Sequence, residues 1–196
     1  MIDKVLKNLV YLLYPRNICA YKDKDEYFIS DEYKRLAKLI ADFDNENRVG
    51  VGKTFIEKFE NDKTLKNFQD LSLFNIEDRC MTLHVTVIEG RQLYTISLFL
   101  SIILPYYVVD VRKNKIELYF SESEITNLEN ENTETRNIKE LVSEISTVIE
   151  TEFMYKKFPN ELVNYVIEDI SFQDSEFGYF TMYNAFFNNV IIEDES

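Results

Sequence analysis

Residues 80–120 alternate between apolar and polar side chains, and this alternation constrains the fold more than any other feature of the chain. A period of two is typical of strands that bury one face. Four strands are expected, with apolar positions at 81–87, 93–104, 106–111 and 116–120. Gly90 suits the first turn because glycine tolerates a positive φ, and Pro105 ends the second strand because it lacks an N–H. Such short connections favour antiparallel pairing.

Residues 92–109 carry no charged side chain, so a membrane-spanning helix is the alternative for this stretch. Three observations favour strands instead. Serine and threonine fall on alternating positions, Pro105 interrupts the stretch, and tyrosine, isoleucine and valine favour extended backbone.

Helical patterns flank the strands. Residues 2–13 are amphipathic, and Ser30 is suited to cap a second helix that runs to about Phe43. The longest helix is expected over about 134–157, before Pro159, and a shorter one is expected to follow the capping-box pattern of Ser121 and Glu124. Further short strands are expected at 27–29, 162–172 and 177–183. The sequence therefore predicts a single α+β domain over 1–196: a mainly antiparallel sheet packed by the long helix and the N-terminal helices.

The net charge of −13 limits the partners that the chain can bind. Nucleic acids and anionic membranes are disfavoured, because both require clustered basic side chains. A basic protein partner is favoured, although acidity alone also serves solubility. Two cysteines do not make a disulfide framework, and the apolar run 9–14 is short for a signal peptide, so a cytoplasmic protein is expected.

Motifs for catalysis, cofactors and metals are incomplete. Gly52-Lys53-Thr54 ends like a phosphate-binding loop, but Asn47 stands where the first glycine is needed. His84 is the only histidine, which excludes metal sites built on two or three histidines. Cys80 and His84 share one face of a strand, but four residues of strand separate them by about 13 Å, too far for a nucleophile–base pair. No cofactor is expected.

The segment 116–135 contains six glutamates and neither lysine nor arginine. Such runs usually form a solvated surface, and they also suit docking on a basic protein. The candidate partner-binding residues are therefore Glu122, Glu124, Glu129, Glu131 and Glu134.

Two stretches resemble small acidic bacterial proteins of toxin–immunity loci. One comprises residues 14–17 together with 27–33, and the other comprises 177–187, with the sequence FGYFTMYNAFF. The resemblance implies a cytoplasmic protein that neutralises a toxin by covering its active site. It transfers no functional residues, because such families diverge at their binding surfaces.

The sequence thus favours a non-enzymatic protein-binding module, with an immunity protein as the specific form. Two alternatives stay open. The 35 acidic residues could include a catalytic pair, as in a carboxylate-based hydrolase, and a structural subunit of a phage or secretion apparatus would form a homo-oligomer. The oligomeric state does not follow from the sequence.

Overall fold

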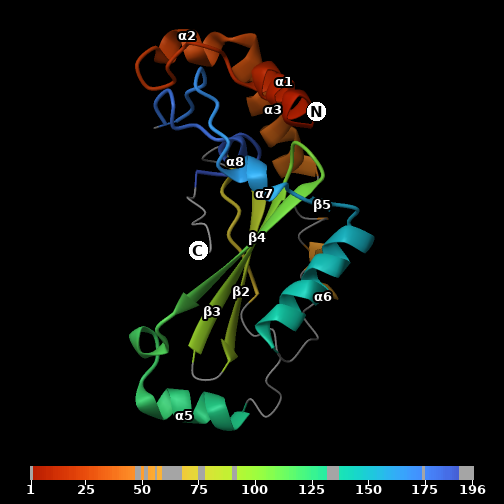
Figure 1. The fold of residues 1–196 in the computed structure, drawn as a ribbon, viewed down its shortest axis with the longest axis vertical. Coiled ribbons are helices and arrows are strands. Elements are labelled where there is room, and N and C mark those ends of the chain that lie inside the picture. Colours follow the sequence, from red (N-terminus) through yellow and green to blue (C-terminus); the bar gives the residue numbers. More distant parts are fainter. Residues whose placement is uncertain are drawn as a thin grey trace.

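The computed structural model describes residues 2–46, 50, 53–55, 57–58, 68–74, 78–89, 92–131, 137–173 and 175–189, of which 46, 117 and 128–131 are described by their backbone alone. Helices and a sheet are combined in an elongated molecule (Figure 1). The elements are α1 (Ile2–Leu13), α2 (Lys24–Ile29), α3 (Asp31–Glu46), β1 (Gln69–Asp70), β2 (Cys80–Glu89), β3 (Gln92–Ser101), β4 (Tyr106–Asn114), η2 (Ile116–Leu118), α5 (Glu122–Glu131), α6 (Ile138–Thr151), β5 (Lys156–Lys157), α7 (Asn160–Val163) and α8 (Met182–Phe186).

The strands form one sheet in the order β1-β2-β3-β4-β5. Three long strands make its centre, and β2 pairs with β3 from Glu89↔Gln92 to Cys80↔Ser101. β4 continues antiparallel to β3, and only the short β5 is parallel to its neighbour. The predicted antiparallel meander is therefore confirmed over residues 80–114.

One face of the sheet is apolar, and α6 covers it. Leu83, Leu98 and Val109 form a cross-strand row on this face, and the first two are fully buried. The hydroxyl of Tyr107, on the same face, donates to Glu150 Oε1 of α6 at 2.7 Å. This contact and the buried Ile145 of α6 place the helix along the sheet (Figure 1).

The opposite, polar face is covered at one end by the C-terminal part of the chain. Phe99 of β3 meets Tyr183 of α8 edge-to-face, with ring centroids 6.1 Å apart. The backbone of Arg79 donates to the carbonyl of Phe187 at 2.8 Å, which fixes α8 above the start of β2. The rest of the polar face holds the groove described below.

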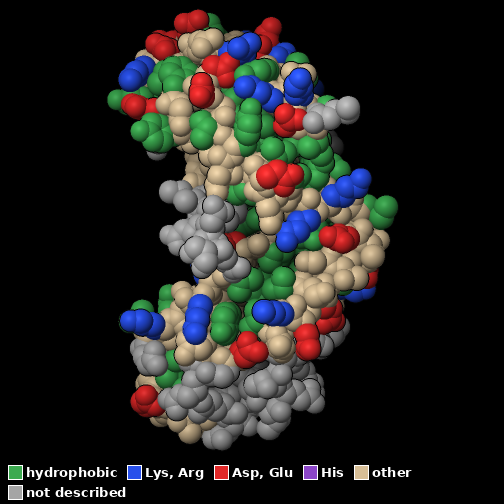
Figure 2. Space-filling view, viewed as in Figure 1, with side chains coloured by type: hydrophobic (Ala, Val, Ile, Leu, Met, Phe, Trp, Pro, Cys, Tyr) green, Lys and Arg blue, Asp and Glu red, His purple; other side chains and the backbone are tan. Residues whose placement is uncertain are grey.

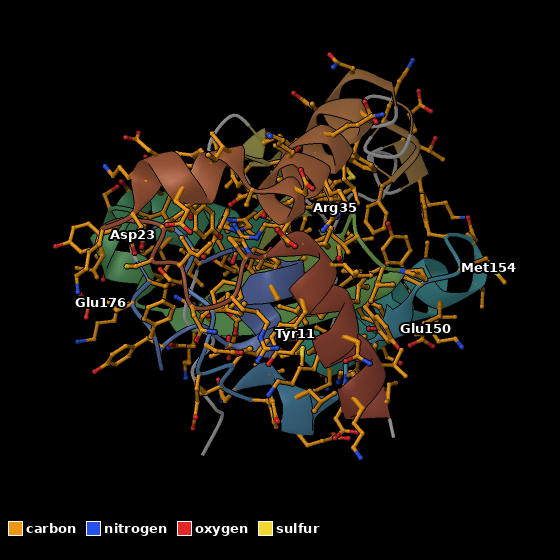
Figure 3. All side chains as sticks on the ribbon, turned by 90° about the horizontal axis from the view of Figure 1, so that it is seen from above. Tyr11, Asp23, Arg35, Glu150, Met154 and Glu176 are labelled. Atoms are coloured by element: carbon orange, nitrogen blue, oxygen red, sulfur yellow. The ribbon has the colours of Figure 1, made fainter. Side chains whose placement is uncertain are left out.

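The N-terminal helices pack beyond this end of the sheet. Seen from above, α1 and α3 lie side by side, and Arg35 of α3 donates from Nε to the carbonyl of Leu12 at 2.8 Å (Figure 3). Ser30 caps α3 as predicted, because its Oγ accepts from the N–H of Tyr33 at 3.2 Å. The predicted helices over 2–13 and from residue 31 onward are both confirmed.

The expected fourth strand at 116–120 is wrong, because this segment forms η2. Leu118 is 76 % exposed, whereas Ile116 is buried against Leu93 and Ile125. The buried positions thus follow a helical turn and not a period of two. The capping-box pattern after η2 does start α5.

One further expectation is wrong and another holds only in part. The predicted strand at 27–29 belongs to α2, whose start carries acidic residues that favour a helix N-terminus. A helix is found within the expected span 134–157, but α6 runs from Ile138 to Thr151, and α3, with 16 residues, is longer than its 14. Residues 134–136 lie outside the described residues. Lys156–Lys157 leave the helical path because they pair with β4 as β5.

The strands expected at 162–172 and 177–183 are replaced by α7, α8 and isolated bridges. Thr181 caps α8 in a reciprocal arrangement with Asn184, which explains why a tyrosine- and phenylalanine-rich segment becomes helical.

The membrane-helix alternative for 92–109 is also excluded, because this stretch forms β3, a bend and the start of β4. Among the described residues, no helix has the length and apolar character needed to cross a bilayer.

Candidate functional site

A groove with a volume of about 690 Å³ lies on the polar face of the sheet. Its floor comes from β2, β3 and β4, and its walls come from the segment before β2, the turn after η2 and the C-terminal part of the chain. Leu71, Leu73, Phe99 and Tyr119 supply apolar surface. The polar lining consists of Asp78, Thr82, His84, Thr95, Ser97, Asp110, Arg112, Asn114, Gln173, Asn188 and Asn189. A concave site that combines apolar walls with convergent polar groups is typical of ligand binding.

The strand register places three chemically active residue types in one row across the floor. His84 of β2 pairs with Ser97 of β3, and Ser97 pairs with Asp110 of β4. Directly paired residues project from the same face of a sheet. The row therefore presents an imidazole, a hydroxyl and a carboxylate side by side.

The order of this row differs from that of a catalytic triad. In a triad the imidazole lies between the hydroxyl and the carboxylate, which orients it. Here Ser97 is central, and two strand spacings separate His84 from Asp110 by about 10 Å. Asp110 instead accepts a bond of 2.7 Å from Nε of Arg112. The row therefore provides hydrogen-bonding groups, but it lacks the acid-oriented histidine of a catalytic triad.

Hydrogen bonds and charges organise the floor further. Asn114 donates from Nδ2 to Thr95 Oγ1 at 3.1 Å. Burial lowers the pKa of His84, the positive charge of Arg112 lowers it further, and Asp110 opposes both. Near neutral pH the imidazole is therefore uncharged, so it can both donate and accept a hydrogen bond.

The end of the groove next to α8 contains a partly buried acid. Burial raises the pKa of Asp78, although the neighbouring Arg79 lowers it. Arg79 is itself fully buried, donates to the carbonyl of Asn184 at 2.7 Å and stacks on the ring of Phe172 at 4.7 Å. Because its guanidinium is held by these contacts, it fixes the wall beside Asp78.

Gln173 lines the same end with an unusual backbone. Its φ is 51°, a left-handed conformation that few residues other than glycine adopt. Its side chain accepts a hydrogen bond from Asn189, which joins two walls of the groove. Backbone strain of this kind is often found at binding sites.

The acidic candidates are only partly placed by the structure. Glu122 and Glu124 are exposed in the first turn of α5. Glu129 and Glu131 belong to α5 by their backbone, and Glu134 lies outside the described residues, as does Gly52 of the loop-like motif. Glu124 has a structural role, because its Oε2 accepts from the N–H and the Oγ of Ser121 at 2.8 and 2.6 Å.

Basic side chains lie close in sequence to these acids. Arg112, Lys113 and Lys115 are exposed at the end of β4 and just after it. Figure 2 shows lysine and arginine interspersed with acids over the lower half of the face in view. The described part of the predicted acidic run therefore lies next to positive charge.

The two cysteines are buried and separate. Burial raises the pKa of the Cys80 thiol to about 12, so the thiolate nucleophile is scarce there. Within the described ranges, no group of three or more histidine, cysteine, aspartate or glutamate side chains is placed to hold a metal ion.

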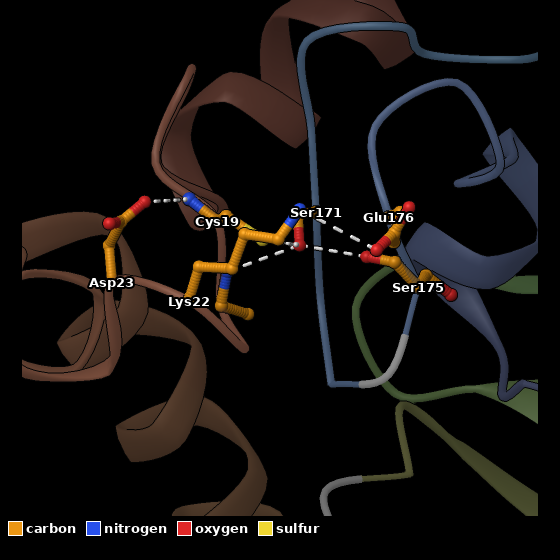
Figure 4. A network of polar contacts seen from close by, with 7 residues as sticks. Cys19, Lys22, Asp23, Ser171, Ser175 and Glu176 are labelled. Atoms are coloured by element: carbon orange, nitrogen blue, oxygen red, sulfur yellow. Dashed lines mark hydrogen bonds and ion pairs between the residues drawn. The ribbon is translucent and has the colours of Figure 1, made fainter.

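The stretches that resemble immunity proteins meet in the core. The ring of Tyr14 packs on Phe172 and Phe180 at 5.3 and 5.1 Å, and Tyr27 also contacts Phe172. A polar network links the neighbouring segments: Ser171 accepts from the N–H of Ala20 at 3.1 Å and donates to the carbonyl of Ser175 at 2.8 Å (Figure 4). The similar residues are therefore largely structural.

Several groove residues were not predicted from the sequence. The sequence pattern assigns no role to Asp78 or Arg112, which line the groove, or to the adjacent Arg79. A usable signal existed for part of the row. A turn with two residues between Glu89 and Gln92 fixes the register that pairs His84 with Ser97.

Comparison of the chain with protein-family models, with curated proteins and with solved structures gives no match.

Proposed function

We propose that this chain is a non-enzymatic, cytoplasmic protein-binding module that receives a basic segment of a partner protein in the groove. The immunity role, neutralisation of a basic toxin, is the specific form of this proposal. It is motivated by the resemblance described above and by the net charge of −13.

The observation that carries the proposal is the pair of acids, Asp78 and Asp110, in a groove otherwise lined mainly by neutral polar groups. The raised pKa of Asp78 means that its charged form is incompletely compensated. A lysine or arginine from the partner would supply that compensation, and the surrounding hydroxyl and carboxamide groups can bind a peptide backbone.

The acids of α5 have a secondary role in this proposal. Tyr119 lines the groove, and Glu122 follows three residues later at the start of α5. Exposed acids at this position would accelerate the encounter with a basic partner, while the groove would supply the buried contacts. Among the candidates, Glu122 is the better probe because Glu124 caps the helix.

The test is affinity capture from the native host with the wild-type chain and a Thr95→Trp variant. Thr95 lies on the groove floor, so the indole would fill the space that the partner segment needs. The matched control is Thr147→Trp, because Thr147 is exposed on α6. A basic protein held by the wild type and the control, but lost with Thr95→Trp, is the expected result.

The purified partner then allows a quantitative test. Asp78→Asn and Asp110→Asn should each weaken binding about tenfold or more, because a charged hydrogen bond contributes roughly 1.5–3 kcal/mol. Glu122→Gln should slow association and flatten its salt dependence, with a smaller effect on dissociation. A captured toxin should also lose its toxicity when it is co-expressed with the wild-type chain.

One observation favours a second function, a carboxylate-based hydrolase. Two acids share the groove; one has a raised pKa, suited to a general acid, and the other is held by Arg112. Turnover of glycoside or ester substrates that is lost in both Asp78→Asn and Asp110→Asn would establish the hydrolase. A panel without turnover, together with a captured basic partner, would favour the binding module.

A further inference from the structure

Among the described residues, the outer edge of β4 is paired only at its start. β5 pairs with β4 only through Tyr106 and Tyr107. Beyond Tyr107, no strand pairs with this edge among the residues that the structure describes. An open edge of this length can accept another strand.

The direction of the free backbone groups follows from the bonds to β5. The carbonyls of Pro105 and Tyr107 accept from the N–H groups of Lys156 and Phe158, so they point away from β3. The backbone groups of successive residues point alternately to the two sides of a strand. The N–H and C=O groups of Val109, Val111 and Lys113 therefore point outward, as those of Tyr107 do. These three residues form the edge that an incoming strand would meet.

When two β4 strands pair along this edge, their charged side chains are complementary. In an antiparallel pair of two β4 strands centred on Val111, Asp110 of one strand lies opposite Arg112 of the other, and this pair occurs twice. It is a non-hydrogen-bonded pair, the type in which side chains approach most closely. Val109 then faces Lys113, so no like charges are opposed.

From this register we infer that β4 binds the β4 strand of a second copy of the chain, which makes one sheet continuous across a twofold axis. Arg112 binds Asp110 of its own chain through Nε at 2.7 Å. A guanidinium carries five N–H groups, so the same side chain can also reach Asp110 of the second copy. The interface is small, and the dimer is therefore of moderate affinity.

The experiment is sedimentation of the full chain from about 1 μM to 1 mM, near physiological salt, because weak dimers dissociate in this range. A dimer of twice the 23.3 kDa chain mass is expected at the upper concentrations. Arg112→Asp places acids opposite each other and should raise the dissociation constant about tenfold or more. The double exchange Asp110→Arg with Arg112→Asp restores opposite charges and should restore the dimer.

A second measurement checks the register without relying on charge. Val111→Cys places two thiols at the twofold axis, where oxidation should link the copies, because the natural cysteines are buried. The exposed Thr147→Cys is the control and should not link them. A monomer at every concentration overturns the inference. So does a dimer that tolerates Arg112→Asp, a folded double exchange that stays monomeric, or the failure of Val111→Cys to link the copies.

Discussion

Tyr14 and Ala185 are 171 positions apart in the chain, and the hydroxyl of Tyr14 donates to the carbonyl of Ala185 at 2.8 Å. Both residues are buried, so this bond joins the end of α1 to α8 in the core. Tyr14→Phe keeps the ring contacts but leaves the buried carbonyl without this donor. We expect the free energy of unfolding to fall by about 1–2 kcal/mol, measured by denaturant titration.

The control for this prediction is Tyr179→Phe. Tyr179 is 74 % exposed, so its hydroxyl stays hydrated in either state. Its substitution should change the free energy of unfolding by less than about 0.5 kcal/mol. Equal effects of the two substitutions would contradict the assigned role of the Tyr14 hydroxyl.

Met154 offers a stabilising substitution. It follows α6 with a φ of 60°, and its side chain is 72 % exposed, so little burial compensates for the left-handed backbone. Glycine adopts this conformation without a steric cost but loses more entropy on folding. Met154→Gly should therefore raise the free energy of unfolding by about 0.5–1 kcal/mol. A loss of stability in thermal denaturation would show that the methionine side chain makes a contribution of its own.

Substitutions of Glu124 and Glu122 distinguish helix capping from a general effect of negative charge. The hydrogen bonds from Ser121 lower the pKa of Glu124. The bond that protects the amide of Ser121 is therefore present above the ordinary pKa of 4.5 and is lost as the pH falls through the lowered value. Glu124→Ala should speed hydrogen exchange at Ser121 and fray the start of α5, whereas Glu122→Ala should leave that amide protected.

Part of the fold and of the site follows from local rules. The period of two in residues 80–111 predicts the three long strands, and the pairing of Glu89 with Gln92 sets the register of the His84–Ser97 pair. Ser30 as a cap predicts the start of α3. These features depend on neighbours within a few residues, so the sequence carries them directly.

The remaining features depend on contacts between distant segments. The position of Asp110 in the row follows from the β3–β4 register, which a longer connection sets. Lys156 and Lys157 become a strand because the backbone of Pro105 and Tyr107 offers partners. The burial of Arg79 requires the carbonyl of Asn184, 105 positions away. No pattern near these residues predicts such contacts.

His84, as the only histidine, gives a single imidazole titration that NMR can follow directly. Burial and the charge of Arg112 lower its pKa below the ordinary value of 6.5, so the unfolded chain binds this proton at a higher pH than the folded chain. The contribution of His84 to stability is therefore complete above pH 6.5 and declines as the pH falls through that value toward the lower folded pKa.

Two substitutions check this prediction for His84. Arg112→Gln removes the nearby positive charge and should move the imidazole titration to higher pH, whereas Arg35→Gln, on the distant α3, should not move it. His84→Gln should remove this part of the pH dependence from denaturant titrations between about pH 7.5 and 5. An imidazole that titrates at or above 6.5 in the wild type would mean that the groove around His84 is more open or more acidic than its burial and the charges of Arg112 and Asp110 imply.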